Sequence, residues 1–342
     1  MDGNTAPAAV ATAPVDWYVD PAFWPKERTG VFAKSWQFVT HESALPEPGS
    51  WVSDNIAGWP ILLIRGEDGQ IRGFHNVCRH RAGPLTQGEA GKCEGPITCR
   101  YHGWAYMWDG RLRAARDFGR AADFDPREFA LYPVKVELWR GLVFVAIEQP
   151  DGSLADWVAP IERRLAGKDW SDLKVGLKRA HPIACNWKTY VENYLEGYHV
   201  PSIHPSLDAE IDSANYTVSM DGLVALHEAP QRDPNAVYEG LWAWMWPNLG
   251  VNVYGRGLMM ERMSPVGPGQ VRLDYTYLTP DGEPVSDQTL AMSDVVTAED
   301  RWVVERVQEN LQAGAYIEGR LSPKHEVAVA AFQAMVRRAI AQ

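Results

Sequence analysis

The stretch Asn186–Pro205 reads NWKTYVENYLEGYHVPSIHP, and the rest of the chain is organised around it. As far as Tyr198 it predicts a helix, because no proline interrupts it and apolar residues recur at helical spacing. Pro201 lacks a backbone donor, so we expect the helix to end just before it. That break allows His199 and His204 to face one point, whereas on one straight helix they would point about 140° apart.

These two histidines are candidate metal ligands. Two imidazoles and a later carboxylate form the facial triad of non-haem iron(II) oxygenases, which leaves coordination positions open for oxygen. Asn193 and Glu196 precede His199 at intervals of three residues, so a helix places all three side chains on one face. A helix end with two ordinary histidines is the alternative, and the pair taken alone favours it.

The third ligand is expected in the C-terminal region, where residues 297–300 read TAED ahead of an apolar helical stripe. Asp300 lies three and four residues before the first two valines of that stripe, so it continues the face that should be buried. A buried carboxylate is costly unless it is paired or binds a metal. Two alternatives stay open: Asp300 belongs to a capping box that begins at Thr297, or Glu299 is the ligand, from a mixed helical face.

A second set of candidate ligands lies a hundred residues upstream. Cys78 and His80 form a Cys-x-His pair, and Cys99 and His102 form a Cys-x-x-His pair. Two thiolates on one iron and two imidazoles on the other are the ligands of a Rieske [2Fe–2S] centre. A Cys2His2 zinc site and chance clustering are the alternatives, but zinc fingers usually pair like residues in sequence. Cys93 is excluded because the position three residues later is proline.

With both ligand sets, the chain resembles the catalytic (α) subunit of Rieske non-haem iron oxygenases. The segments that carry the resemblance are FHNVCRHRAGPL, CRYHGWAYMWDGRL and CNWKTYVENYLEGYHVPSIH, with a weaker match in AEDRWVVERVQENL. Residues 247–249, PNL, resemble a stretch in the choline monooxygenase-like, N-demethylating branch of the family. The resemblance also favours Asp300 as the third iron ligand.

The resemblance implies an α+β protein, in which an antiparallel-β Rieske domain precedes a helix-grip-like catalytic domain, an antiparallel sheet covered by helices. It implies a [2Fe–2S] cluster, a mononuclear Fe(II), and electrons from NAD(P)H. No Gly-rich dinucleotide motif is present, so a separate reductase, possibly with a ferredoxin, must deliver those electrons. Glu196 is expected to bridge His199 and His102 of a neighbouring subunit in a homotrimer, and Asn193 is grouped with it as a candidate catalytic residue.

Turn signals divide the chain. We expect a disordered tail over 1–17, an N-terminal helix over 18–37, a Rieske domain over 38–150 and the catalytic domain over 151–342, with the boundary at Pro150-Asp151-Gly152.

Composition excludes several partners. A net charge of −11 and a pI near 5.3 argue against nucleic acid or an anionic membrane. No apolar run reaches the roughly 18 residues that a membrane span needs. Four cysteines, two of them assigned to the cluster, fit a cytoplasmic protein without a disulfide framework.

Three tryptophans are candidates for a substrate pocket. Trp242, Trp244 and Trp246 alternate with apolar residues, so on a strand their indoles share one face. Such a face either packs against helices or binds substrate. Indole rings stack on an aromatic ring and attract a quaternary ammonium by cation–π interaction.

The predicted function is that of a terminal oxygenase that uses O2 to hydroxylate, or N- or O-demethylate, a small quaternary amine or aromatic compound. An aromatic ring cis-dihydroxylating dioxygenase is the alternative. A Rieske electron carrier without catalysis is the alternative from another class, and the second metal site argues against it.

Overall fold

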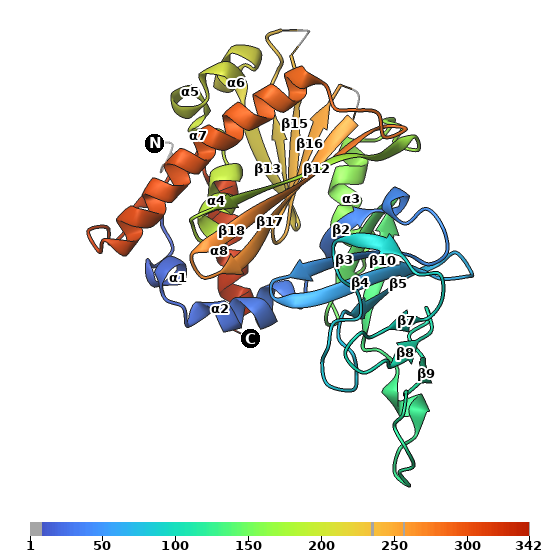
Figure 1. The fold of residues 1–342 in the computed structure, drawn as a ribbon. Helices are drawn as coiled ribbons and strands as arrows, with labels where there is room; N and C mark the ends of the chain where they lie inside the picture. The colour runs from blue at the N-terminus through green and yellow to red at the C-terminus, as the bar shows by residue number, and fades with distance from the viewer. Residues whose placement is uncertain (1–8, 234–235, 256, 342) are drawn as a thin grey trace. The chain divides into compact units, whose positions relative to one another are not determined.

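The computed structural model describes residues 9–233, 236–255 and 257–341, which form two compact units (Figure 1). One unit is Phe32–Leu154, and the other joins Met1–Val31 to Ala155–Gln342. The N-terminal segment therefore belongs to the same unit as residues 155–342, which is called the catalytic unit below. The chain passes from one unit to the other after Leu154, whereas the expected boundary was at 150–151. Among the described residues, none of the helices has the length and apolar character that crossing a bilayer requires.

The Phe32–Leu154 unit consists of antiparallel sheets, as predicted. Its large sheet has the strand order β2-β11-β10-β5-β4-β3-β6, and a small sheet has the order β7-β8-β9. The bounds are β2 Gln37–His41, β3 Ser50–Ile56, β4 Trp59–Arg65, β5 Ile71–His75, β6 Ala90–Lys92, β7 Ile97–Thr98, β8 Ala105–Tyr106, β9 Leu112–Ala114, β10 Pro133–Trp139 and β11 Leu142–Ala146. The turn between β4 and β5 lies at the predicted Glu67–Gln70 step.

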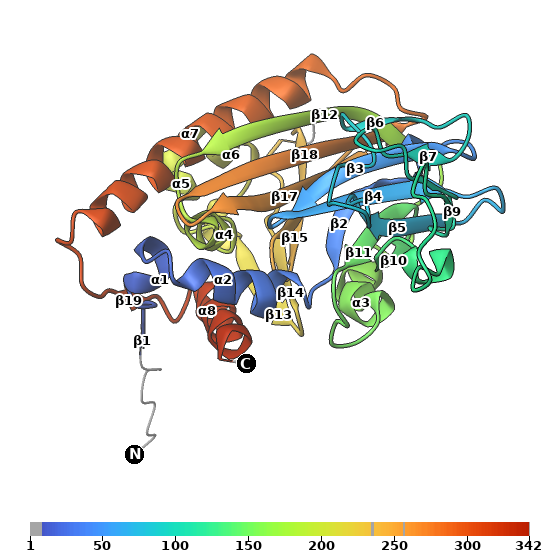
Figure 2. The ribbon, with the colours of Figure 1, turned by 60° about the horizontal axis from the view of Figure 1, so that its bottom comes forward.

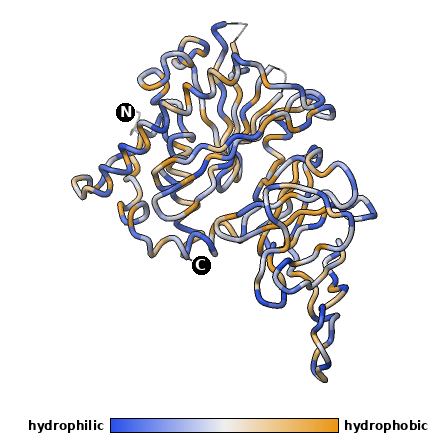
Figure 3. Tube along the Cα trace, viewed as in Figure 1, coloured by the Kyte–Doolittle hydropathy of each residue, from blue (hydrophilic) through white to orange (hydrophobic). Residues whose placement is uncertain are grey.

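Alternation along β4 builds two cores, one on each face of the large sheet. Ile61 and Leu63 contribute to one apolar cluster, whereas Leu62 and Ile64 contribute to the other, because successive side chains point to opposite faces. Figure 3 shows hydrophobic residues recurring along the strands of both units. The second cluster also contains Cys78 and Cys99, so the predicted cluster loops are anchored in a packed core.

The catalytic unit is built on a seven-stranded antiparallel sheet with the order β12-β18-β17-β16-β15-β14-β13. The bounds are β12 Leu173–Ile183, β13 Thr217–Asp221, β14 Val224–Glu228, β15 Tyr238–Met245, β16 Leu249–Tyr254, β17 Gly257–Gly267 and β18 Gln270–Pro280. The sequence alone does not identify β12 as a strand. Its pattern is weak because exposed and half-buried residues occupy most of the strand at the sheet edge.

Helices cover both faces of this sheet (Figures 1 and 2). One face carries α4 Trp187–Tyr194, α5 Val200–Ile203, α6 Pro205–Glu210, the long α7 Asp287–Gln312 and α8 Val327–Ile340. The α3 helix, Leu154–Arg164, lies on the opposite face, where Ile161 approaches Leu241 and Ala243 of β15. The expected antiparallel sheet covered by helices is confirmed.

The N-terminal predictions are wrong for the described residues. Residues 10–17 are not a disordered tail: β1 Val10–Ala11 pairs with β19 Arg320–Leu321, and α1 Asp16–Val19 follows. Residues 1–8 lie outside the described part. The single helix expected over 18–37 is replaced by α2 Phe23–Glu27 and a π-helical turn, Arg28–Phe32. Local composition could not reveal a strand whose partner lies about 300 residues away.

Two helix ends also differ from expectation. The α4 helix ends at Tyr194 rather than near Tyr198, because the carboxylate of Glu196 accepts the backbone N–H groups of Tyr198 and His199 and so competes with helical bonds. Pro201 does not end that helix; it lies in the first turn of α5. The α7 helix begins at Asp287 and is capped by Ser286, ten residues before the predicted start.

Candidate metal centres and substrate cavity

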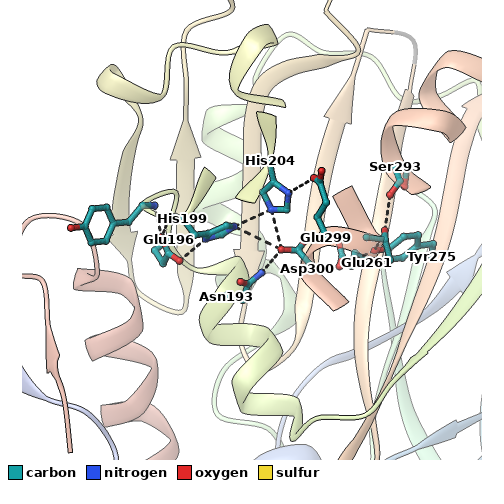
Figure 4. A network of polar contacts seen from close by, with 11 residues as sticks. Asn193, Glu196, His199, His204, Glu261, Tyr275, Ser293, Glu299 and Asp300 are labelled. Atoms are coloured by element: carbon teal, nitrogen blue, oxygen red, sulfur yellow. Dashed lines mark hydrogen bonds and ion pairs between the residues drawn. The ribbon is translucent and has the colours of Figure 1, made fainter. Parts of the chain in front are cut away.

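Three side chains of the catalytic unit converge as a metal site (Figure 4). His199 Nε2 and His204 Nε2 lie 3.2 Å apart, and Asp300 Oδ1 lies 3.0 Å from the His204 atom and 3.8 Å from the His199 atom. Ligand atoms about 2.1 Å from one metal ion and at right angles to each other lie about 3 Å apart. The donor set and its spacing therefore fit the facial triad of an iron(II) site.

The three proposed ligands lie at the ends of two short helices and in one long helix. His199 lies just before α5, His204 lies between α5 and α6, and Asp300 lies in the middle of α7. Pro201 and Pro205 each occupy the first turn of a short helix, where a missing N–H costs nothing, and they fix the backbone on either side of His204. Because α7 starts at 287, Thr297 is in mid-helix, which removes the capping-box alternative for Asp300.

Each histidine of the triad is oriented by its own carboxylate. Glu196 Oε1 lies 2.6 Å from His199 Nδ1, and Glu299 Oε2 lies 2.8 Å from His204 Nδ1. A carboxylate on Nδ1 holds the proton there and leaves Nε2 bare for the metal. The predicted Glu196 contact is present. Glu299, which the sequence left open as an alternative ligand, instead positions His204.

Neighbouring charges act on the buried ligands as well. Burial lowers the pKa of His204, but the hydrogen bonds and charges of Asp300 and Glu299 together outweigh burial and raise that pKa. Asn193 Nδ2 donates to Asp300 Oδ1 at 2.7 Å, which fixes the carboxylate that faces the histidines. Asn193 is therefore a positioning residue for Asp300, a more specific role than the sequence analysis gave it.

The four predicted cluster ligands lie together in the other unit. Cys78 and Cys99 are buried, and their thiols are within hydrogen-bonding reach. The imidazole centroids of His80 and His102 are 4.5 Å apart. His80 Nδ1 is buried without a hydrogen-bond partner among the described residues, as expected of an atom that binds a metal. The set fits a Rieske centre, with paired thiolates on one side and paired imidazoles on the other.

The two ligand loops close in the same way. The backbone N–H of Cys78 donates to Gly83 O at 2.8 Å, and that of Cys99 donates to Trp104 O at 2.9 Å, each five residues ahead. Ala82 and Gly103, four residues after each cysteine, adopt positive φ values of 54° and 74° and donate back to the cysteine carbonyl. The loops are therefore equivalent in backbone although their histidines differ by one position.

Two aromatic side chains contact the proposed cluster ligands. Tyr106 Oη lies 3.3 Å from Cys78 Sγ, a hydrogen bond that would tune a cluster sulfur. Trp104 stacks on His80, with centroids 4.9 Å apart and ring planes 6° from parallel. Neither was predicted, because the motif spacing carries no information on ring stacking. Cys93 follows β6 and its backbone bonds to Gly49 instead.

A cavity of about 90 Å³ adjoins the triad, and His199, His204 and Asp300 form part of its wall. Its size suits a few water molecules or one small ligand, since a water needs roughly 10–15 Å³. Aromatic side chains supply much of the rest: Tyr190, Tyr194, Tyr216, Tyr238, Trp242 and Tyr275.

The three predicted pocket tryptophans separate in the structure. Trp242 lines the cavity and stacks on Tyr216, with centroids 5.9 Å apart. Trp244 and Trp246 pack against Phe332 of α8, with centroids at 5.6 and 6.0 Å, and do not line it. The pocket prediction is thus wrong for those two. They share the face of Trp242, but a different helix covers that part of the sheet.

Two polar residues of the cavity wall escaped the sequence analysis. Glu261 of β17 is only 5% exposed, and burial, with the nearby charge of Asp300, raises the pKa of its carboxyl to about 7. His227 of β14 is fully buried, which lowers its pKa to about 3, and its Nδ1 meets Tyr216 Oη at 3.0 Å. Nothing in their local sequence separates them from ordinary strand residues.

Known proteins resemble the chain along nearly its whole length. Residues 35–125 match the Rieske [2Fe-2S] domain, and residues 170–342 match the catalytic domain of the ring hydroxylating alpha subunit. The oxygenase subunit of carnitine monooxygenase from Escherichia coli is 33% identical over 327 residues, which cover 91% of this chain and 87% of that protein.

Two further relatives agree. Chloroplastic choline monooxygenase from Beta vulgaris is 30% identical over 341 residues, 94% of this chain and 75% of that protein. A solved quaternary ammonium Rieske monooxygenase has a TM-score of 0.88 at 28% identity, and the match covers 97% of this chain and 96% of that one. The chain therefore belongs to the Rieske non-haem iron oxygenases, as the catalytic α subunit and O2-using terminal component that receives electrons from a reductase.

Proposed function

We propose that this oxygenase oxidises a C–H bond of a small quaternary ammonium compound, which gives N-demethylation where that carbon is an N-methyl group. One observation carries the proposal: five tyrosines and one tryptophan contribute rings to the wall of the cavity that adjoins His199, His204 and Asp300. Ring faces attract a cation that cannot donate hydrogen bonds, and aromatic cages are the common protein site for quaternary ammonium groups.

The protein's own side chains prepare the reaction. Glu196 and Glu299 keep the triad histidines in the tautomer that presents Nε2, and Asn193 holds the Asp300 carboxylate in place. The aromatic wall positions the substrate and excludes water. When bound, the [2Fe–2S] cluster would supply single electrons, and Fe(II) would supply the O2 chemistry.

The relatives support this substrate class. Those named above are described as choline, carnitine or quaternary ammonium monooxygenases. Ring stacking would also suit an aromatic substrate, but a carboxyl group buried in the wall, Glu261, favours a cation over a neutral ring. Ring cis-dihydroxylation is therefore the weaker candidate.

Glu196 is proposed to connect the two metal centres between subunits. It binds His199 Nδ1 through Oε1, and its side chain is 13% exposed. Its second oxygen, Oε2, accepts the backbone N–H groups of Tyr198 and His199. A carboxylate offers about four acceptor positions, and among the described residues Oε1 has only His199 Nδ1 as a partner within the chain, so His102 of a neighbouring copy in a head-to-tail trimer stays the proposed partner. The related structure is described as revealing inter-subunit electron transfer.

Electron delivery through a ferredoxin as well as a reductase, and a cytoplasmic location, stay predictions. The Beta vulgaris relative is described as chloroplastic, so location varies among related chains.

The test is substrate-dependent O2 uptake by the iron-loaded protein with a generic reductase and NADH. We expect choline or a related amine to stimulate uptake, whereas 3,3-dimethyl-1-butanol, its uncharged isostere, and benzoate should not. Metal analysis should give about three iron atoms per chain, against two for a simple carrier. Uptake with benzoate and a dihydrodiol product would overturn the proposal in favour of ring dioxygenation.

A further inference from the structure

Glu261 differs from the other carboxyl groups around the cavity in its partners. Asp300 belongs to the triad, and Glu196 is committed to His199. The carboxylate of Glu261 meets only neutral groups: the Asn252 amide and the Tyr275 hydroxyl, both at 3.3 Å, and the hydroxyl of Tyr190. Among the described residues no Lys, Arg or His forms an ion pair with it, so a negative charge there has no counter-ion in the protein.

The strand register places Glu261 on the floor of the cavity. His227, Trp242, Asn252 and Met259 lie opposite one another across β14 to β17, so they share one face of the sheet. Glu261 lies two residues beyond Met259 on β17 and therefore points to the same side. All five line the cavity, and Figure 4 shows Glu261 next to Tyr275.

The opposite end of this floor is polar but uncharged. His227 lies three strands from Glu261, roughly 14 Å across the sheet, since neighbouring strands are about 4.8 Å apart. Burial keeps its imidazole neutral, and its Nε2 has no hydrogen-bond partner among the described residues. A neutral imidazole can bond a hydroxyl group of a ligand but offers no charge to a carboxylate.

The described residues of the cavity wall include no Lys or Arg. A zwitterionic substrate would place its carboxylate in a cavity that contains Glu261 and Glu196 and has no Lys or Arg among its described wall residues. Burying an unpaired charge costs far more than burying a hydroxyl that has a partner.

From these observations we propose that Glu261 is the specificity-determining counter-charge of the site, and that it selects a small quaternary ammonium compound with an uncharged polar end, such as an amino alcohol, over one with a carboxylate. The proposal rests on the proposed function and deepens it. The aromatic rings would accept a quaternary ammonium compound with or without a carboxylate, whereas Glu261 and the lack of Lys or Arg in the described wall discriminate between the two.

The experiment measures binding, not turnover. Isothermal titration of the iron-loaded, oxygen-free protein would give dissociation constants for tetramethylammonium, choline, glycine betaine and 3,3-dimethyl-1-butanol. We expect the wild type to bind choline at least about tenfold more tightly than either the neutral isostere or betaine. Glu261→Gln keeps the side-chain shape, and it should reduce the choline-to-isostere preference at least about tenfold while the isostere binds as before.

Glu192→Gln is the matched control. Glu192 is a half-buried carboxyl whose pKa burial raises to about 7, but it accepts hydrogen bonds from Tyr18 and Gln333 and does not line this cavity. It should keep the wild-type preference. An unchanged choline-to-isostere preference in Glu261→Gln would overturn the proposal. A wild type that binds betaine or the isostere as tightly as choline would also overturn it, and that result does not depend on the folding of a variant.

The outcomes also separate this inference from the proposed function. If Glu261→Gln weakens tetramethylammonium binding while the wild type oxidises no amine, that result would support the role of Glu261 and contradict the proposed reaction. If amines are oxidised and Glu261→Gln binds them with wild-type preference, the reaction stands and the counter-charge falls.

Discussion

The two metal centres of this protein are built by different means. The cluster ligands lie within residues 78–102, in two loops closed by the same pattern of backbone hydrogen bonds. The iron ligands are drawn from residues 199–300, and side-chain carboxylates orient them. The backbone hydrogen bonds that close the cluster loops depend only on local sequence. The contacts between carboxylates and the iron-binding histidines depend instead on how α4, α5 and α7 pack. The cluster site should therefore tolerate distant substitutions, and the iron site should not.

The largest effect that tests this comparison is expected from Asp300→Ala. It removes one of three ligands from the triad, so turnover should become undetectable and the mononuclear iron should be lost. The Rieske absorption should persist, because the cluster loops belong to the other unit and are closed by their own backbone hydrogen bonds. Iron analysis and the visible spectrum measure the two sites separately. Asp294→Ala, on the same helix but paired with Arg179 at the surface, is the control and should keep both.

His102→Cys should act on the cluster alone. Imidazole ligation distinguishes Rieske centres from all-cysteine clusters, so the reduction potential should fall by roughly several hundred millivolts. Protein-film voltammetry would measure it. The mononuclear iron content should not change, and Cys93→Ser should alter neither site. An unaltered potential in the first variant, or a bleached cluster in the second, would show that the ligand assignment is wrong.

Glu196→Gln tests whether the two centres communicate through a side chain. Both metals and the oligomer should be retained, because the amide can still occupy the position beside His199 Nδ1. Loss of the bridging charge should slow oxidation of the reduced cluster by about two orders of magnitude or more. Stopped-flow mixing with O2 and substrate measures that rate. Wild-type kinetics would leave Glu196 only its role of orienting His199, and a monomer in solution would refute the proposed trimer.

The smallest effect should come from Glu299→Gln, which weakens the support of one ligand. Loss of a carboxylate partner from a metal-bound histidine typically costs about 10- to 100-fold in metal affinity. We expect that loss in an iron(II) titration, with the cluster spectrum unchanged. Glu309→Gln, exposed on the same helix and paired with Arg306, should bind iron like the wild type. Equal affinities in the two variants would mean that packing alone orients His204.

The sequence by itself determined the fold class and the set of proposed ligands. Cys78, His80, Cys99 and His102 were recognisable because ligand spacing within a loop is a local property. His199, His204 and Asp300 were predicted from an expected helix break between the histidines, although Glu196 rather than Pro201 ends the helix, and from a carboxylate on an apolar helix face. Alternating and continuous apolar runs gave the antiparallel sheets, since burial of one or both faces is encoded every second residue.

Only the tertiary structure decided which neighbours support those ligands. Glu299 is adjacent to Asp300 in sequence, yet its role depends on where the α5–α6 junction holds His204. Trp242 meets the cavity while Trp244 meets Phe332, because α8 covers one part of a sheet face and not another. Glu261 became a candidate counter-charge only through strand register and the absence of an opposing cation among the described residues. These relations join residues far apart in the chain, and no local pattern records which side chains packing will bring together.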